Sequence, residues 1–122
     1  VTTCAAKARG IAGVVIDGFI TDRSAIIDEA FPVWCRGHSP ITTKPRGIGG
    51  DVNVAINCGG VAVRPGDMVL ADESGVVVMD PGQAETFCRR ARLMQHQEID
   101  ILDRLRAGET LAQITRGEKS SA

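Results

Sequence analysis

The stretch from Gly13 to Asp22, Gly-Val-Val-Ile-Asp-Gly-Phe-Ile-Thr-Asp, restricts the fold of this chain more than any other. Its β-branched run over residues 14–16 shows no polar alternation, which predicts a strand covered on both faces. We expect Asp17 and Gly18 to end that strand. In open α/β sheets, ligands and catalytic carboxylates collect in the loops just beyond strand ends. Asp22 is therefore the first candidate for a functional residue.

The chain length, the net charge and the length of the apolar runs favour one domain of modest size and exclude two classes of partner. A chain of 122 residues can bury roughly two thirds of its unfolded surface as a single domain. Fourteen basic and fifteen acidic residues give a net charge of −1, without a basic tract for nucleic acid. No apolar run approaches the roughly 20 residues of a membrane-spanning helix. We therefore expect neither a nucleic-acid partner nor membrane binding.

The four cysteines are far apart and lack the CxxC spacing of a zinc site or a redox motif. Buried, reduced thiols in a cytoplasmic protein are the simplest interpretation of Cys4, Cys35, Cys58 and Cys88.

Apolar patterning and turn residues predict an α/β chain with a mixed sheet. The predicted elements are a helix over 1–9 ending at Gly10, a strand over 11–16, a helix over 23–30, a strand over 32–35, a half-buried strand over 51–57, strands over 61–63, 68–71 and 76–79, a helix over 82–106 and an amphipathic tail over 109–114. We expect residues 36–50 to be a loop and the strand over 76–79 to be fully buried. Asp67 and Asp72 occupy turns that favour hydrogen bonds to the local backbone.

The long helix carries one apolar stripe with an acid inside it. Spacings of three, four or their sum draw the stripe through Phe87, Ala91, Met94, Leu102 and Leu105. Glu98 fills the gap in this stripe, and a carboxylate on a buried seam needs a partner.

Two further observations concern the glycines and the first residues. Gly47, Gly49 and Gly50 lack the flanking strand and helix of a P-loop or a dinucleotide fingerprint. The first nine residues have helical composition without an N-cap, so we expect the chain to open partway through a helix, with residues missing upstream.

Three stretches agree in order, spacing and length with one known family. They are Ala8–Gly18, Phe31–Gly37, and Cys58–Asp67 running into Ala71–Val78. In these motifs the chain resembles the RraA-like family, which includes the regulator of ribonuclease activity A and the metal-dependent 4-hydroxy-4-methyl-2-oxoglutarate aldolases.

The resemblance implies a fold, an assembly and an activity. The fold is a swivelling β/β/α domain over residues 1–122, with a mixed sheet and a long C-terminal helix, that lacks the N-terminal part of the family fold. The assembly is a trimer, or a hexamer built from trimers, with active sites at subunit clefts. The activity is cleavage of a 2-oxo-4-hydroxy acid to pyruvate and a second 2-oxo acid, with oxaloacetate decarboxylation, through an enolate stabilised by Mg²⁺ or Mn²⁺.

The resemblance also assigns roles to individual residues. The metal-anchoring aspartate falls on Asp22, where one carboxylate plus waters suits Mg²⁺. The glutamate from a neighbouring subunit falls near Glu98. Thr21 stands where the aldolases have an arginine that pairs with the substrate carboxylate, and Arg23 is a hypothetical substitute. The glycine-rich loop that binds the pyruvate carboxylate would lie upstream of residue 1.

Alternatives stay open for each of these residues and for the whole chain. Asp22 can instead cap the helix that follows it, and Glu98 can form an ordinary ion pair with an arginine of another element or subunit. Asp17 binds either substrate or the local backbone, and Arg36 and Arg64 contact either another subunit or a substrate carboxylate. The alternative function is a non-catalytic regulator that binds a ribonuclease or another protein.

Overall fold

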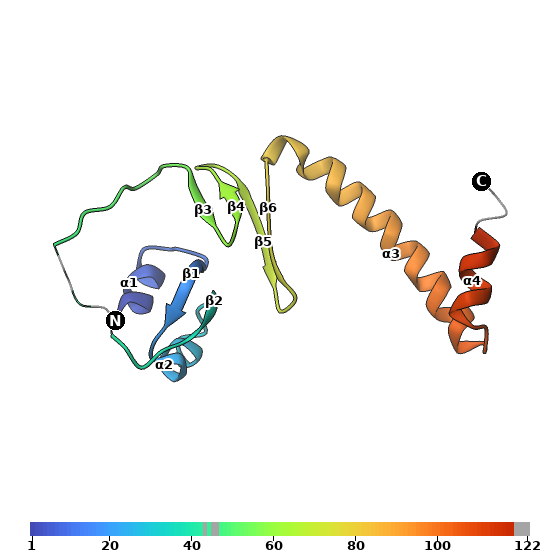
Figure 1. The fold of residues 1–122 in the computed structure, drawn as a ribbon, viewed down its shortest axis with the longest axis horizontal. Helices are drawn as coiled ribbons and strands as arrows, with labels where there is room; N and C mark the ends of the chain where they lie inside the picture. Colours follow the sequence, from blue (N-terminus) through green and yellow to red (C-terminus); the bar gives the residue numbers. More distant parts are fainter. Residues whose placement is uncertain (43, 45–46, 119–122) are drawn as a thin grey trace. The chain divides into compact units, whose positions relative to one another are not determined.

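The computed structural model describes residues 1–42, 44 and 47–118 as two compact units, one over residues 1–80 and one from Pro81 onward (Figure 1). The fold class predicted from the sequence is confirmed, because helices alternate with strands and a long helix follows the last strand. The division into a single domain over residues 1–122 stays a prediction.

The first unit begins with a helix and a parallel strand pair. Helix α1 spans Thr2–Ala8, and strand β1 (Val14–Ile20) pairs in parallel with β2 (Val33–His38). Helix α2 (Arg23–Asp28) lies in the connection between them, as a parallel pair requires a crossover. The pairing register of β1 with β2 shifts between Ile16 and Phe19, that is, at Asp17 and Gly18.

Two antiparallel hairpins complete the first unit. Strands β3 (Ile56–Cys58) and β4 (Val61–Val63) are joined by Gly59 and Gly60, which both take the positive φ of a tight hairpin turn. Strands β5 (Met68–Asp72) and β6 (Gly75–Met79) form the second hairpin. The described strands thus form three two-stranded sheets.

The turn aspartates behave as predicted. Asp67 accepts a hydrogen bond from the Arg64 amide at 2.7 Å. Asp72 accepts one from the Ser74 amide at 2.8 Å and one from the Gly75 amide at 3.2 Å. The Trp34 indole donates to the Asp72 carbonyl at 2.8 Å, which joins β2 to the second hairpin.

Three predicted strand boundaries are wrong. Strand β1 does not end at Asp17 but runs on to Ile20, because β2 continues beside it to His38, through residues expected to form a loop. A strand was expected over residues 51–57, but only the last two of these residues belong to a strand, β3. Asn53 has a φ of 60°, a left-handed conformation that no strand accommodates.

Burial is much lower than the sequence predicts. Val15 in β1 is 39% exposed and Val77 in β6 is 54% exposed, so neither strand is covered on both faces within this chain. A two-stranded sheet has no second layer unless another element supplies it. Phe31 is the buried apolar side chain of the described first unit. All four thiols are free, but Cys4 and Cys88 are exposed, contrary to the expectation that they would be buried.

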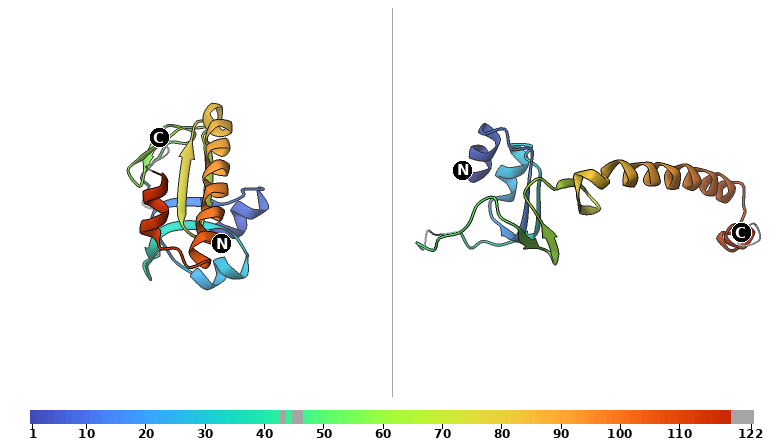
Figure 2. Two further views of the ribbon diagram at one scale, coloured as in Figure 1. Left: turned by 90° about the vertical axis from the view of Figure 1, so that its right-hand side faces the viewer. Right: turned by 90° about the horizontal axis from the view of Figure 1, so that it is seen from above.

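The second unit is helical. A short 3₁₀ turn over Pro81–Gln83 leads into α3 (Ala84–Arg106), close to the predicted bounds, and α4 (Leu111–Glu118) folds back beside the last turns of α3 (Figure 2). Ile114 of α4 is completely buried. The apolar stripe of α3 is exposed in this chain, so its predicted burial requires a partner surface. Within the described residues, no helix is long and apolar enough to cross a membrane.

Candidate functional site

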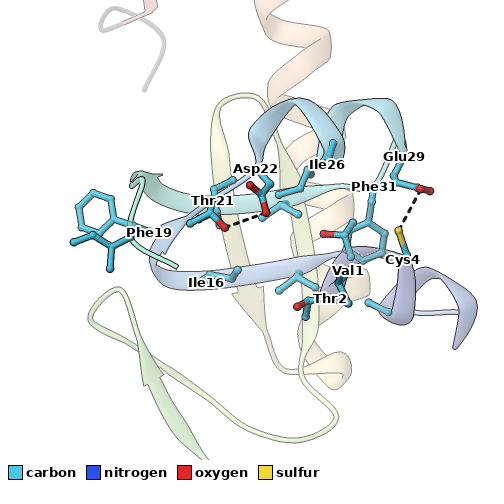
Figure 3. A pocket seen from close by; sticks show the side chains of 17 residues that line it. Val1, Thr2, Cys4, Ile16, Phe19, Thr21, Asp22, Ile26, Glu29 and Phe31 are labelled. Carbon is cyan, nitrogen blue, oxygen red and sulfur yellow. Dashed lines mark hydrogen bonds between the residues drawn. The ribbon is translucent and has the colours of Figure 1, made fainter. Parts of the chain in front are cut away.

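A pocket of about 320 Å³ lies in the first unit, where α1, β1 and α2 meet (Figure 3). Parallel strand β1 ends at Ile20, and Thr21 and Asp22 line the pocket directly after that end. This is the position at which α/β sheets collect functional side chains. The apolar wall of the pocket includes Ile16, Phe19, Ile26 and Phe31.

Asp22 occupies the N-cap position of α2 without acting as a side-chain cap. Its carboxylate makes no capping hydrogen bond, and its backbone is left-handed, with φ 54° and ψ 41°. Thr21 Oγ1 donates to Asp22 Oδ2 at 3.5 Å (Figure 3). Aspartate tolerates this conformation better than most residues, but the left-handed backbone still raises the free energy of the folded state. Such strained residues cluster at functional sites. Asp22 is also exposed, so solvent can reach its side chain.

Arg23 is not among the residues that line this pocket. Its side chain lines a shallow hollow with Ile27 and His38, whereas Thr21 lines the pocket itself. That hollow adjoins the pocket, because Ile20, Ile26, Phe31 and Val33 line both.

Glu29 forms a polar cluster with α1 at the same pocket. Its Oε1 accepts a hydrogen bond from Cys4 Sγ at 3.2 Å, and its Oε2 contacts Lys7 Nζ at 3.3 Å. Lys7 Nζ also donates to the Glu29 backbone carbonyl at 2.5 Å. The hydrogen bonds from Cys4 and Lys7 hold the pKa of Glu29 below its usual value. Sequence reasoning missed this cluster, because its members lie more than twenty residues apart and follow no motif.

Asp17 faces a different cavity. It lines a hollow of about 480 Å³ between the parallel pair and the two hairpins, together with Arg36 and Gly59. Arg36 Nε is hydrogen-bonded to one carboxylate oxygen, and the Gly59 amide donates to the other at 2.9 Å. The Arg36 hydrogen bond, and then the Gly59 amide, lower the pKa of Asp17. Asp17 thus joins β1, β2 and the first hairpin, and Arg36 is paired within the chain.

Glu98 lies in the second unit, on α3. It borders a shallow hollow with Arg92, His96 and Leu102, and it has no hydrogen-bond partner among the described residues. The structure does not bring Glu98 together with Asp22 within one unit. A role for Glu98 across a subunit interface stays a prediction.

The donor set fits one kind of metal site. The described residues contain no cluster of three or more His, Cys, Asp or Glu side chains that could hold an ion. Of the two carboxylates that line this pocket, Glu29 is paired with Lys7 whereas Asp22 is in no ion pair among the described residues, and Mg²⁺ commonly binds through one or two carboxylates while keeping several waters. A singly anchored, hydrated ion is compatible with Asp22, whereas a closed protein cage is not.

Comparison with known proteins places the chain in a family. Residues 1–78 match the RraA-like family, described as Aldolase/RraA, and they include Thr21 and Asp22. The chain belongs to the RraA-like family. An RraA-like relative from Halalkalibacterium halodurans, named "Putative 4-hydroxy-4-methyl-2-oxoglutarate aldolase", is 46% identical over 90 residues, which are 74% of this chain and 42% of the relative.

Solved RraA-like structures support the same fold. An uncharacterized protein from Pseudomonas syringae pv. tomato matches with a TM-score of 0.75 and 31% identity, over 92% of this chain and 56% of that one. Streptomyces coelicolor RraAS2, described as an unusual member of the RNase ES inhibitor RraA protein family, matches with a TM-score of 0.65 and 32% identity, over 82% of this chain and 50% of that one. The chain thus spans about half the length of these relatives.

Proposed function

We propose that this RraA-like chain carries part of the active site of a carbon–carbon lyase that releases pyruvate from a small 4-hydroxy-2-oxo acid. One observation carries the proposal: the Asp22 carboxylate stands at a pocket, in a strained backbone conformation, and caps nothing. The names of the relatives point to the same class of reaction.

The reaction needs few groups from the protein. The C4 hydroxyl loses its proton, the C3–C4 bond breaks to leave a carbonyl compound, and C3 takes up a proton to complete pyruvate. A divalent ion at Asp22, Mg²⁺ or Mn²⁺, would supply Lewis-acid polarisation of the 2-oxo group. Asp22 would hold that ion, and Ile16, Phe19 and Phe31 form an apolar wall beside it. Decarboxylation of oxaloacetate to pyruvate would use the same groups.

Two further features belong to this proposal. Glu98 of a neighbouring copy would assist proton transfer, since α3 exposes it together with an apolar stripe. The assembly would be a homo-oligomer, a trimer or a hexamer, in the cytoplasm.

The test is pyruvate release from oxaloacetate and from 4-hydroxy-4-methyl-2-oxoglutarate, with Mg²⁺ or Mn²⁺ and with a chelator. We expect Asp22→Asn to lower kcat/KM by roughly a hundredfold or more, because asparagine keeps the backbone but removes the charge. Asp28→Asn is the matched control, because Asp28 belongs to α2 but does not line the pocket. Equal activity of the Asp22 and Asp28 variants would contradict the assignment of Asp22.

A second function is favoured by one specific observation. Thr21 cannot supply the cationic fork that would pair with a substrate carboxylate, and the relative RraAS2 is described within a family of ribonuclease inhibitors. The alternative is a regulator that binds a ribonuclease or another protein. If the folded, metal-loaded oligomer released no pyruvate but inhibited an RNase E-type enzyme, with a loss of inhibition in variants of the α3 stripe, the regulator would replace the lyase.

A further inference from the structure

Helix α2 connects two polar sites of the first unit. Asp22, the carboxylate at the pocket, occupies the N-cap position of α2, and Glu29, in the polar cluster with α1, occupies the C-cap position. Backbone hydrogen bonds run through the helix between them, because the Ile26 amide donates to the Asp22 carbonyl and the Glu29 amide donates to the Ala25 carbonyl, both at 3.2 Å. A contact that fixes the C-terminus of this short helix therefore also restrains the position of Asp22.

Helix α2 has little apolar packing of its own. None of its side chains is fully buried, and Ile26 is the one that is half-buried. Asp22 and Ala30, on either side of the helix, have left-handed backbones with φ of 54° and 48°, which raise the free energy of the folded state. Because an isolated helix of this length is marginal in water, α2 depends on contacts with other elements.

Lys7 of α1 provides such a contact at the C-terminus of α2. Its Nζ donates to the Glu29 carbonyl at 2.5 Å and lies 3.3 Å from Glu29 Oε2. The last carbonyls of a helix lack intrahelical partners and form the negative end of its dipole, so an ammonium group satisfies one of them and interacts favourably with the dipole. Cys4 and Glu29, which are also hydrogen-bonded to each other, both line the pocket (Figure 3). The contact between α1 and α2 thus lies at the pocket wall.

We propose, building on the metal site of the lyase function above, that Lys7 is a positioning residue for Asp22. Its ammonium group holds the C-terminus of α2, and the helix in turn keeps the Asp22 carboxylate in the orientation that binds the divalent ion. Lys7 is not among the residues that line the pocket, so it acts through α2 rather than by touching the ion or the substrate. Loss of the ammonium group would leave the Glu29 carbonyl to water and release that end of the helix.

Binding of Mn²⁺, followed by the EPR signal of the free ion, tests this role without a substrate. We expect Lys7→Met, which keeps the length of the side chain but removes the ammonium group, to raise the Kd for Mn²⁺ roughly three- to tenfold in the folded protein. The direction is diagnostic, because removing a positive charge would by itself strengthen the binding of a cation. Lys7→Arg should restore the affinity, since a guanidinium group can donate to the same carbonyl. Arg9→Met is the matched control, because Arg9, the C-cap of α1, is not among the described residues bound to Glu29.

A double variant separates positioning from general destabilisation. In an Asp22→Asn background, Lys7→Met should cause no further loss of Mn²⁺ affinity, because its effect passes through Asp22. An equal loss in both backgrounds, or an unchanged or stronger affinity in Lys7→Met alone, would overturn the role of Lys7 and leave the lyase standing. If Lys7→Met does not fold, Glu29→Gln, which keeps the carbonyl but removes the charge beside Lys7, should give a smaller loss, and no loss would overturn the role. Wild-type binding that Asp22→Asn did not weaken would overturn the metal site of the lyase and this inference together.

Discussion

Asp17 and Asp22 lie close together in the sequence, yet they serve different surfaces. Asp17 faces the hollow between the parallel pair and the hairpins, where Arg36 and the Gly59 amide occupy both carboxylate oxygens. Asp22 lies beyond the end of β1 at the other pocket, where Thr21 is the one described residue that hydrogen-bonds to its carboxylate. The pairing of Asp17 accounts for a structural role, and Asp22 is the acid for which we propose ligand binding.

The hydrogen bonds that Asp17 accepts from Arg36 and Gly59 predict a specific dependence of stability on pH. Because its folded pKa is lowered, its contribution to the free energy of unfolding is present above the unfolded value of about 3.9 and is lost as the pH falls through the folded value. We expect Asp17→Asn to unfold at lower urea concentration than wild type near neutral pH, and the difference to shrink in acid. Urea titrations across this range measure it, with Asp28→Asn as the control. A difference that grew in acid would contradict the assignment.

At the scale of elements, the local sequence pattern predicted most helices and hairpins. It failed where a strand end or a side-chain contact depends on a distant element of the chain. Gly10, Pro32 and the turn aspartates act through neighbouring residues, so α1, α2 and the β5–β6 turn could be anticipated. The extension of β1 to Ile20 depends on β2, and the Glu29 cluster depends on α1. Neither dependence is visible in a local window. For the same reason, the sequence could nominate Asp22 and Thr21 but not Glu29.

The Glu29 cluster predicts the reactivity of Cys4. In Glu29→Ala, the Cys4 thiol loses the carboxylate that accepts its hydrogen bond, so a reagent that approaches the sulfur meets neither that side chain nor its negative charge. We expect Cys4 to react with a maleimide roughly three to ten times faster, as measured by mass spectrometry of labelled peptides. The exposed Cys88 on α3 is the internal control. An equal increase at both thiols would indicate general unfolding rather than loss of this contact.

Ile114 is expected to hold α4 against α3. It is the one completely buried side chain of the described second unit, and replacing a buried isoleucine with alanine costs about 2–5 kcal/mol. Because a helix as short as α4 is marginal without packing, Ile114→Ala should lower helicity and speed amide exchange in α4. Leu111→Ala, at a largely exposed position of the same helix, should change little. Unchanged exchange in both variants would mean that another contact holds α4.

For the whole molecule, exposed apolar surface is the dominant feature. Large side chains of β1, β6 and α3 are exposed in both units, although their patterning predicts burial. Sequence periodicity reports which face will be covered, but it cannot tell whether the cover comes from the same chain. This explains why the predicted fold class is confirmed while the predicted burial is not.

The α3 stripe therefore predicts self-association. We expect the chain to sediment as an oligomer, and Met94→Glu to shift it towards smaller species, because this charge enters the centre of the apolar stripe. His96→Glu adds the same carboxylate on the opposite, polar face of α3 and should leave the mass unchanged. Analytical ultracentrifugation measures both variants. An oligomer that Met94→Glu left intact would place the interface elsewhere.

The left-handed backbone of Asp22 has a consequence for any mutational scan of this protein. At position 22 the chain geometry alone ranks glycine, asparagine and aspartate above the other residues, and penalises β-branched ones most. A library selected only for folded protein would thus enrich the same few residues as one selected for activity. Only the gap between aspartate and asparagine, which share a shape but differ in charge, would distinguish selection for chemistry from selection for conformation.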